Sequence, residues 1–224
     1  MNWNAALAPV KNRGIPPRAF LDELVAWART APDEIFAPND NAGDVFTQIL
    51  QHRIGPCESF VHRKAALLEL MRVLAGFESS WNWREGVDTS KTTPNNPDNE
   101  EAGAWQISFD SRALGDDLKT MLARFGIMSG NGFIIITKNR HAFAMEYAAR
   151  LFRHTTHHNG PLARHEVDSW LSRAAVEEFR DALNEDHGPT PDAPIPQPSG
   201  FFASLGSRLR GLFSSAKLSS ACAA

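Results

Sequence analysis

The spacing of apolar residues along the chain predicts a mainly helical fold. Apolar side chains recur at steps of three and four residues over 18–30, 44–52, 139–152 and 168–183, a period typical of amphipathic helices. The longest such pattern runs over 58–77, where the apolar positions are Phe60, Leu67, Leu70, Met71, Leu74 and Phe77. We therefore expect a central, buried helix over 58–77.

Short polar residues mark where further helices should begin. Asp110, Asn139 and Asp168 each precede a periodic stretch, and such side chains are favoured N-caps because they bond to free N–H groups in the first turn. Apolar residues alternate with others over 103–109 closely enough to predict a brief strand or an extended turn, and 133–137 is a second candidate strand. The expected class is mainly α, an α+β arrangement with a very small sheet.

Changes in composition divide the chain into four parts. Residues 1–54 are expected to form a helical preface packed on a main domain over 55–186. Residues 187–200 contain five prolines and form a linker that cannot hold a core. Residues 201–224 combine regularly spaced apolar side chains with Arg and Lys, and they are expected to form a basic amphipathic tail. The tail is expected to contact membrane weakly, to dock on a partner, or to pack back on the domain.

Charge and cysteine content exclude several classes of function. The formal net charge of −3 over 224 residues gives no field that would gather nucleic acid. Cys57 and Cys222 lie too far apart to indicate a disulfide framework or a zinc spacing, and we expect neither a cofactor nor a metal. The N-terminus lacks the basic and apolar regions of a secretion signal. We therefore expect synthesis in the cytoplasm and, for a substrate outside the membrane, delivery by a route other than a cleaved signal.

Glu78 is the strongest catalytic candidate. It continues the apolar stripe of Leu67, Met71 and Leu74 at steps of four, three and four residues, so its carboxyl should emerge on the buried face. Burial and the negative end of the helix dipole both raise a carboxyl pKa, and a protonated carboxyl near neutral pH is what a general acid requires. The alternative is that Glu78 is only the first exposed residue beyond a helix end.

An acidic loop follows Glu78 and leads into a segment suited to sugars. The segment 103–108 offers a close backbone approach at Gly103 and a Gln amide beside an aromatic face. A second carboxylate could come from the loop, where we favour Glu101 and Asp98 because they immediately precede Gly103; the other two acids are Asp88 and Glu100. The loop is equally compatible with a solvated acidic turn, and no EF-hand spacing indicates calcium.

Together these segments resemble a known superfamily. Glu-Ser-Ser-Trp at 78–81, a polar loop, and Gly-Ala-Trp-Gln-Ile-Ser at 103–108 resemble the lysozyme-like superfamily of goose-type lysozymes and lytic transglycosylases, which carry Glu-Ser near a helix end followed by Gly-x-x-Gln. The likeness covers roughly 58–180, including the 139–152 helix. It implies a lysozyme-like helical fold and cleavage of glycan strands.

The resemblance also implies roles for individual residues. Glu78 would be the catalytic acid, and the residues implied at the substrate are Ser79, Gly103, Trp105, Gln106 and Tyr147. Trp81 is either a sugar-stacking platform or a buried anchor. The chain departs from lytic transglycosylases, because no Ala-Tyr-Asn type segment follows its single Tyr. That departure favours hydrolysis over the reaction that forms an anhydro product.

The expected function is a bacteriolytic peptidoglycan hydrolase, a muramidase-like glycosidase that cleaves the β-1,4 backbone. Its substrate would be the glycan strands of the cell wall. The protein would reach them as a phage endolysin or as an antibacterial toxin effector, and the effector route would imply an immunity or inhibitor protein as a partner. The alternatives are a hydrolase of chitin or chitosan and a catalytically silent glycan-binding module. His154, His157 and His158 could suggest zinc, but a solvated helix end is the favoured interpretation because no His-Glu-x-x-His helix is present.

Overall fold

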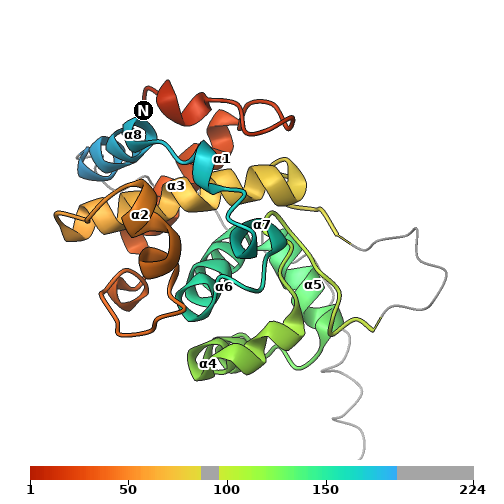
Figure 1. The fold of residues 1–224 in the computed structure, drawn as a ribbon. Coiled ribbons are helices and arrows are strands. Elements are labelled where there is room, and N and C mark those ends of the chain that lie inside the picture. Colours follow the sequence, from red (N-terminus) through yellow and green to blue (C-terminus); the bar gives the residue numbers. More distant parts are fainter. Residues whose placement is uncertain (87–95, 186–224) are drawn as a thin grey trace, which may run out of the picture. The chain divides into compact units, whose positions relative to one another are not determined.

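A computed structural model describes residues 1–86 and 96–185, and Met1–Glu185 form one compact unit. This unit is mainly helical (Figure 1). Its elements, with η marking 3-10 and π turns, are η1 Ala5–Leu7, α1 Arg18–Thr30, η2 Asp33–Ile35, η3 Phe46–Leu50, α2 Gln51–Arg53, α3 Phe60–Ser79, η4 Phe109–Leu114, α4 Asp116–Arg124, α5 Gly130–Asn139, α6 His141–His154, α7 Gly160–Ala163, η5 Asp168–Trp170 and α8 Arg173–Asn184.

The central helix α3 is the expected buried element. It runs for 20 residues and begins at Ser59, whose side chain accepts a hydrogen bond from the His62 N–H. Every residue from Ala65 to Phe77 is buried, and a helix that is covered on all sides belongs to the core of a domain. Figure 1 shows α3 crossing the middle of the unit, and it packs against α1 and α8.

An ion pair lies inside this core. Arg72 donates to both carboxylate oxygens of Glu69, at 2.7 and 2.8 Å, and both side chains are excluded from solvent. Glu69 also accepts from the Ser172 N–H, and Arg72 donates to the Ala8 carbonyl. Because buried charges need complete hydrogen bonding, the pair joins α3 to the start of α8 and to the N-terminal segment.

The α4, α5 and α6 helices pack around a second group of aromatic side chains. Phe133 of α5 lies edge-on to Tyr147 of α6, with ring centroids 4.8 Å apart, and Phe143 stacks on the same Tyr147. All three rings are buried. Aromatic pairs in such offset arrangements add to the stability from area burial, so this cluster fixes α5 against α6.

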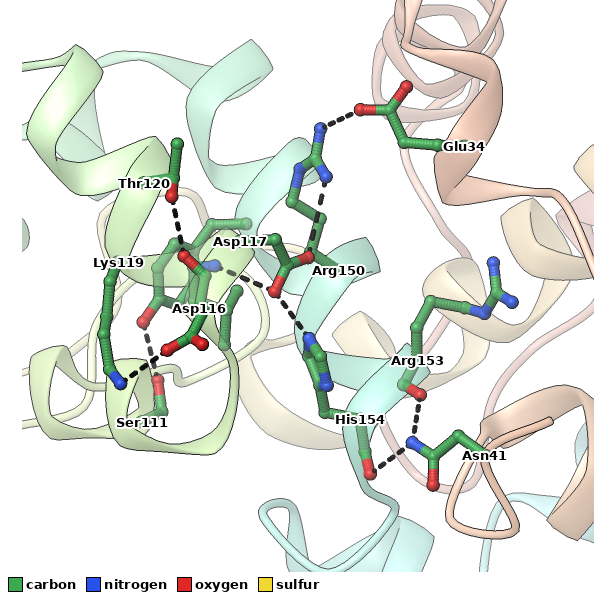
Figure 2. Close-up of polar contacts among 12 residues, drawn as sticks. Glu34, Asn41, Ser111, Asp116, Asp117, Lys119, Thr120, Arg150, Arg153 and His154 are labelled. Carbon is green, nitrogen blue, oxygen red and sulfur yellow. Dashed lines mark hydrogen bonds and ion pairs between the residues drawn. The ribbon is translucent and has the colours of Figure 1, made fainter. Parts of the chain in front are cut away.

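A polar network nearer the C-terminal end of α6 ties three elements together. Figure 2 shows the Arg150 guanidinium between Glu34 of η2 and Asp117 of α4, with His154 on the far side of Asp117. The Arg150–Glu34 contact is 3.0 Å and the His154–Asp117 contact is 2.6 Å. Arg150 is almost fully buried, so the network holds η2 and α4 onto α6.

The expected strands do not form in the described part of the chain. Residues 133–137 lie inside α5, so the prediction of a strand there is wrong. The apolar run that suggested it is short, and a run of that length cannot distinguish a buried helix from a strand. For 103–109 the sequence left a strand or a turn open, and the structure has a turn at 103–106 between isolated bridges at Gly86–Ala102 and Ala102–Ile107, with Phe109 already in η4.

Three predicted helix starts are also wrong. Asp110 lies inside η4, Asn139 is the last residue of α5, and Asp168 begins the short turn η5. The side chains that cap α5 and α8 are Ser129 and Ser172. The segment expected as one helix over 44–52 is a π turn, η3, continued by one turn of α2.

No helix among the described residues is both long enough and apolar enough to cross a membrane. The predicted linker over 187–200 and the amphipathic tail over 201–224 lie outside the described residues.

Candidate active site

The C-terminal end of α3 is held in one conformation by two residues with a reversed backbone. Ser80 and Trp81 have φ values of 55° and 62°, the left-handed region that ends many helices. Trp81 folds back on α3, where its Nε1 donates to the Arg72 carbonyl at 2.8 Å. The Trp81 ring lies so close to Gly76 that a Cβ atom added to Gly76 would be 2.8 Å from the ring. Glu78, in the last turn, is therefore on a rigid support.

The segment after the acidic loop is fastened directly to this helix. The Trp105 Nε1 donates to the carbonyl of Met71 at 2.9 Å, and the Ser79 hydroxyl donates to the carbonyl of Ala104 at 2.9 Å. Both contacts join α3 to residues 25 or more positions later in the chain. The structure thus brings Glu78 and the 103–106 segment together, as the sequence predicts.

A tight turn shapes this segment. Gly103 has a φ of 75° and Gln106 a φ of 45°, and the Gln106 Nε2 donates to the Gly103 carbonyl at 2.8 Å. A Cβ on Gly103 would approach the Thr137 methyl to 2.8 Å. Only glycine fits this position without strain, because it lacks a Cβ and tolerates positive φ. The close approach at Gly103 is made to Thr137 of α5 within the protein, whereas the sequence pattern predicts it at a sugar.

Asn159 connects Glu78 with the same turn. Its buried Nδ2 donates to the Trp105 carbonyl at 2.8 Å and lies 3.3 Å from Oε1 of Glu78. The carbonyl bond fixes which way the amide faces, so an N–H group points to the Glu78 carboxyl. Asn159 therefore positions Glu78 relative to the 103–106 segment.

The environment of Glu78 raises the pKa of its carboxyl to about 7. Burial is the largest cause, because it penalises the charged form. The nearby charge of Glu101 also raises the pKa, while the Asn159 hydrogen bond and the charges of Arg164 and Arg13 lower it. Near neutral pH a large fraction of the molecules thus carries a protonated Glu78, which can donate a proton to a bound ligand.

The two favoured second carboxylates have different surroundings. Glu101 is exposed, and its charge acts on Glu78. The Asp98 carboxylate accepts from the Gly130 N–H at 2.9 Å, so it is engaged with the start of α5. Glu100 is half-buried, and Asp88 lies outside the described residues. Of the favoured pair, Glu101 is the one with an electrostatic link to Glu78.

Several residues implied at the substrate are instead buried. Trp105 and Tyr147 have no exposed surface, and Trp81 is 5% exposed. The Tyr147 hydroxyl lies 3.0 Å from the Ser111 hydroxyl, and burial raises its pKa to about 12. In this structure the rings of Trp105 and Tyr147 therefore support the site from within, and Trp81 is the buried anchor rather than a sugar-stacking platform.

Ser79 and Gln106 also use their side chains within the protein. The Ser79 hydroxyl donates to the Ala104 carbonyl and accepts from the Asn82 N–H. The amide of half-buried Gln106 donates to the Gly103 carbonyl. Both residues hold the turn beside Glu78 in place.

Sequence reasoning missed Asn159, Arg13 and Arg164. The local sequence pattern carries no signal of the contact between Asn159 and Glu78, which spans 81 residues. The two arginines lie far apart in the sequence, before α1 and just after α7, and only folding brings both of them near Glu78. Their positive charges stand beside the Glu78 carboxyl.

The histidines at the end of α6 make separate contacts. His154 pairs with Asp117, and His158 is half-buried, so that burial lowers its pKa. Within residues 1–86 and 96–185, no group of three or more His, Cys, Asp or Glu side chains could hold a metal ion.

Comparison of the chain with family models, curated proteins and solved structures finds no match to any of them.

Proposed function

We propose that this protein is a lysozyme-like glycoside hydrolase that cleaves the β-1,4 backbone of peptidoglycan, with Glu78 as the general acid. The single observation that carries the proposal is the state of Glu78, a half-buried carboxyl with a pKa of about 7 that Asn159 connects to the Trp105 carbonyl. Glycosidases require one carboxyl that is protonated at the working pH and stands at the glycosidic oxygen.

The proposed reaction uses the proton of Glu78 and a second carboxylate. Glu78 would donate its proton to the leaving oxygen while positive charge develops on the sugar ring. Glu101, which is exposed, is the group that would stabilise that charge or activate a water molecule, since its charge already acts on Glu78. Removal of the proton from Glu78 as the pH rises through about 7 would end catalysis.

The choice of peptidoglycan over chitin or chitosan comes from the resemblance at 78–81 and 103–108. Two routes to the cell wall fit the proposal, release as a phage endolysin and injection as an antibacterial effector. The second route would require a cognate immunity protein. A neighbouring gene for a small exported protein supports the effector, whereas neighbouring holin or tail genes support the lysin.

The test compares Glu78→Gln with the wild-type protein on purified sacculi. Release of reducing ends should fall by at least about a thousandfold, because the variant has no acidic proton at this position. Glu177→Gln is a matched control, since Glu177 is also half-buried but lies on α8. A Glu78→Gln variant with full activity contradicts the proposal, and binding of sacculi by the wild type without any release supports a silent glycan-binding module.

A further inference from the structure

A cavity of about 220 Å³ lies beside the start of α3. Its walls come from residues 38–39, from the η3–α2 segment, from residues 55–57, and from Arg63 of α3. Arg63 is fifteen residues before Glu78 on the same helix, which separates the two by about 22 Å along the helix axis. The cavity is therefore distinct from the candidate active site.

Arg63 presents part of its guanidinium group without a partner. Its Nε donates to the Phe36 carbonyl at 2.7 Å, and its Cζ lies 3.8 Å from the centre of the Phe46 ring. These two contacts fix the plane of the group. Among the described residues, its Nη1 and Nη2 have no hydrogen-bond or ion-pair partner. A guanidinium held this way offers a rigid fork of N–H donors.

The acidic residue in the cavity wall, Asp44, acts on Arg63 but forms its ion pair with a different arginine. Asp44 is buried, and Arg153 holds it with Nε 3.0 Å from each carboxylate oxygen and Nη2 at 2.9 Å. The remaining titratable wall residue is Cys57, and burial raises the pKa of its thiol, so it is neutral at physiological pH. With Asp44 paired to Arg153, one positive charge in the cavity is left over, that of Arg63.

The rest of the wall supplies uncharged hydrogen-bonding groups. Thr47 and Gln51 are four residues apart, which places them on one side of the η3–α2 segment, and both line the cavity. Asn39 adds an amide whose Oδ1 already accepts from the Asn41 N–H. η3 is a π turn, a rare conformation that occurs often at functional sites.

We propose that this cavity binds a small oxyanion, a carboxylate or a phosphate group, through Nη1 and Nη2 of Arg63. Paired N–H groups in one plane match two oxygens of a carboxylate or phosphate. The ligand is small, because 220 Å³ lies below the volume of about 300–1,000 Å³ that is usual for drug-sized ligands. Binding would place a counter-ion on a guanidinium that is half-buried.

The first experiment titrates the full-length wild-type protein with inorganic phosphate and with acetate while amide NMR signals are followed. The expected result is saturable shifts at Thr47, Gln51 and Gly55, and no such shifts with chloride at equal ionic strength. Linear shifts that never saturate, or shifts equal to those with chloride, overturn the proposal. This measurement needs no variant and does not depend on glycan cleavage.

The second experiment measures phosphate affinity by calorimetry in Arg63→Gln and Arg63→Lys. Arg63→Gln should weaken binding by at least about tenfold, because a hydrogen bond to a charged group is lost, and Arg63→Lys should weaken it less. Arg112→Gln is the matched control, since Arg112 also stacks on a Phe ring, at 3.7 Å, and donates to a backbone carbonyl. Equal affinity in Arg63→Gln and Arg112→Gln overturns the proposal.

Discussion

The half-buried carboxyl of Glu78 should lower the stability of the folded protein at neutral pH. Its pKa is about 7 when folded and 4.5 in the reference state. Between these values the unfolded chain has released a proton that the folded chain still binds, so stability is full below about pH 4.5 and falls as the pH rises through 7. The proposed catalytic role would explain why the chain retains this carboxyl.

The prediction that follows concerns Glu78→Gln, which keeps the acceptor for Asn159 and removes the ionisation. Its free energy of unfolding should exceed that of the wild type by about 3 kcal/mol at pH 8 and by almost nothing at pH 4. Urea unfolding at the two pH values measures this. The same difference at both pH values would show that ionisation of Glu78 is not the cause.

Asn159 is predicted to act as a positioning residue. Asn159→Leu removes the donor that faces Glu78, so kcat/KM on sacculi should fall by about 10- to 100-fold. In the wild type this hydrogen bond lowers the pKa of Glu78. Its loss in the variant should raise that pKa, so the basic limb of the pH profile should also move to higher pH. A residue with only a packing role would leave that limb unchanged, which makes the pH profile the deciding measurement.

At the scale of single residues, the sequence predicts the place of Glu78 in the fold better than the contacts that its neighbours make. The position of Glu78 follows from helical spacing, which is a local property. The burial of Trp105 and the contact of Asn159 depend on which segments meet after folding, and no local pattern carries that information. The acidic loop offers four carboxylates, of which the sequence favours Glu101 and Asp98, and only the folded chain distinguishes these two.

At the scale of elements, the turn at Gly103 should tolerate no side chain. Gly103→Ala introduces a Cβ at a positive φ and 2.8 Å from the Thr137 methyl, which should cost about 2–4 kcal/mol of stability. Gly126→Ala is the matched control, because Gly126 has a φ of 68° with open space around it. Thermal unfolding compares the two, and equal losses would mean that backbone strain alone accounts for the effect.

Helices with a strong apolar periodicity were predictable from the sequence, but the residues at which they begin and end were less predictable. The predicted boundaries of α1 match the structure, and the central helix was expected over 58–77 and found as Phe60–Ser79. The wrong starts arose where Asp or Asn stood a few residues before a helix: Ser172 supplies the actual cap of α8, and Gly115 and Arg140 precede α4 and α6 without a side-chain cap. The strand predicted inside α5 failed because tertiary packing, rather than β-propensity, decides the state of a short apolar run.

At the scale of the whole molecule, the buried pair of Glu69 and Arg72 connects distant parts of the chain. Arg72→Met would leave the Glu69 carboxylate buried without its partner and should lower the free energy of unfolding by about 3–5 kcal/mol. The double variant Glu69→Leu with Arg72→Met should recover much of that loss, because no unpaired charge remains. Urea unfolding of both variants measures the difference, and a double variant no more stable than the single one contradicts this account.

The helical class and the central position of α3 follow from the sequence pattern over the whole chain. The near absence of sheet in the described residues does not. Apart from the isolated bridges of Ala102, the 102–107 segment is ordered by bonds to α3 and to Asn159, the residue before α7. Long-range contacts of this kind determine the site.

The central claim is that Glu78 delivers a proton to a glycosidic oxygen of peptidoglycan, and mass analysis of the soluble products from digested sacculi tests it most directly. The account predicts disaccharide-peptides that carry reducing ends and can be reduced by borohydride, produced by the wild type and absent with Glu78→Gln. Intact glycan strands after exhaustive digestion by the wild type, or the same products from Glu78→Gln, would contradict it.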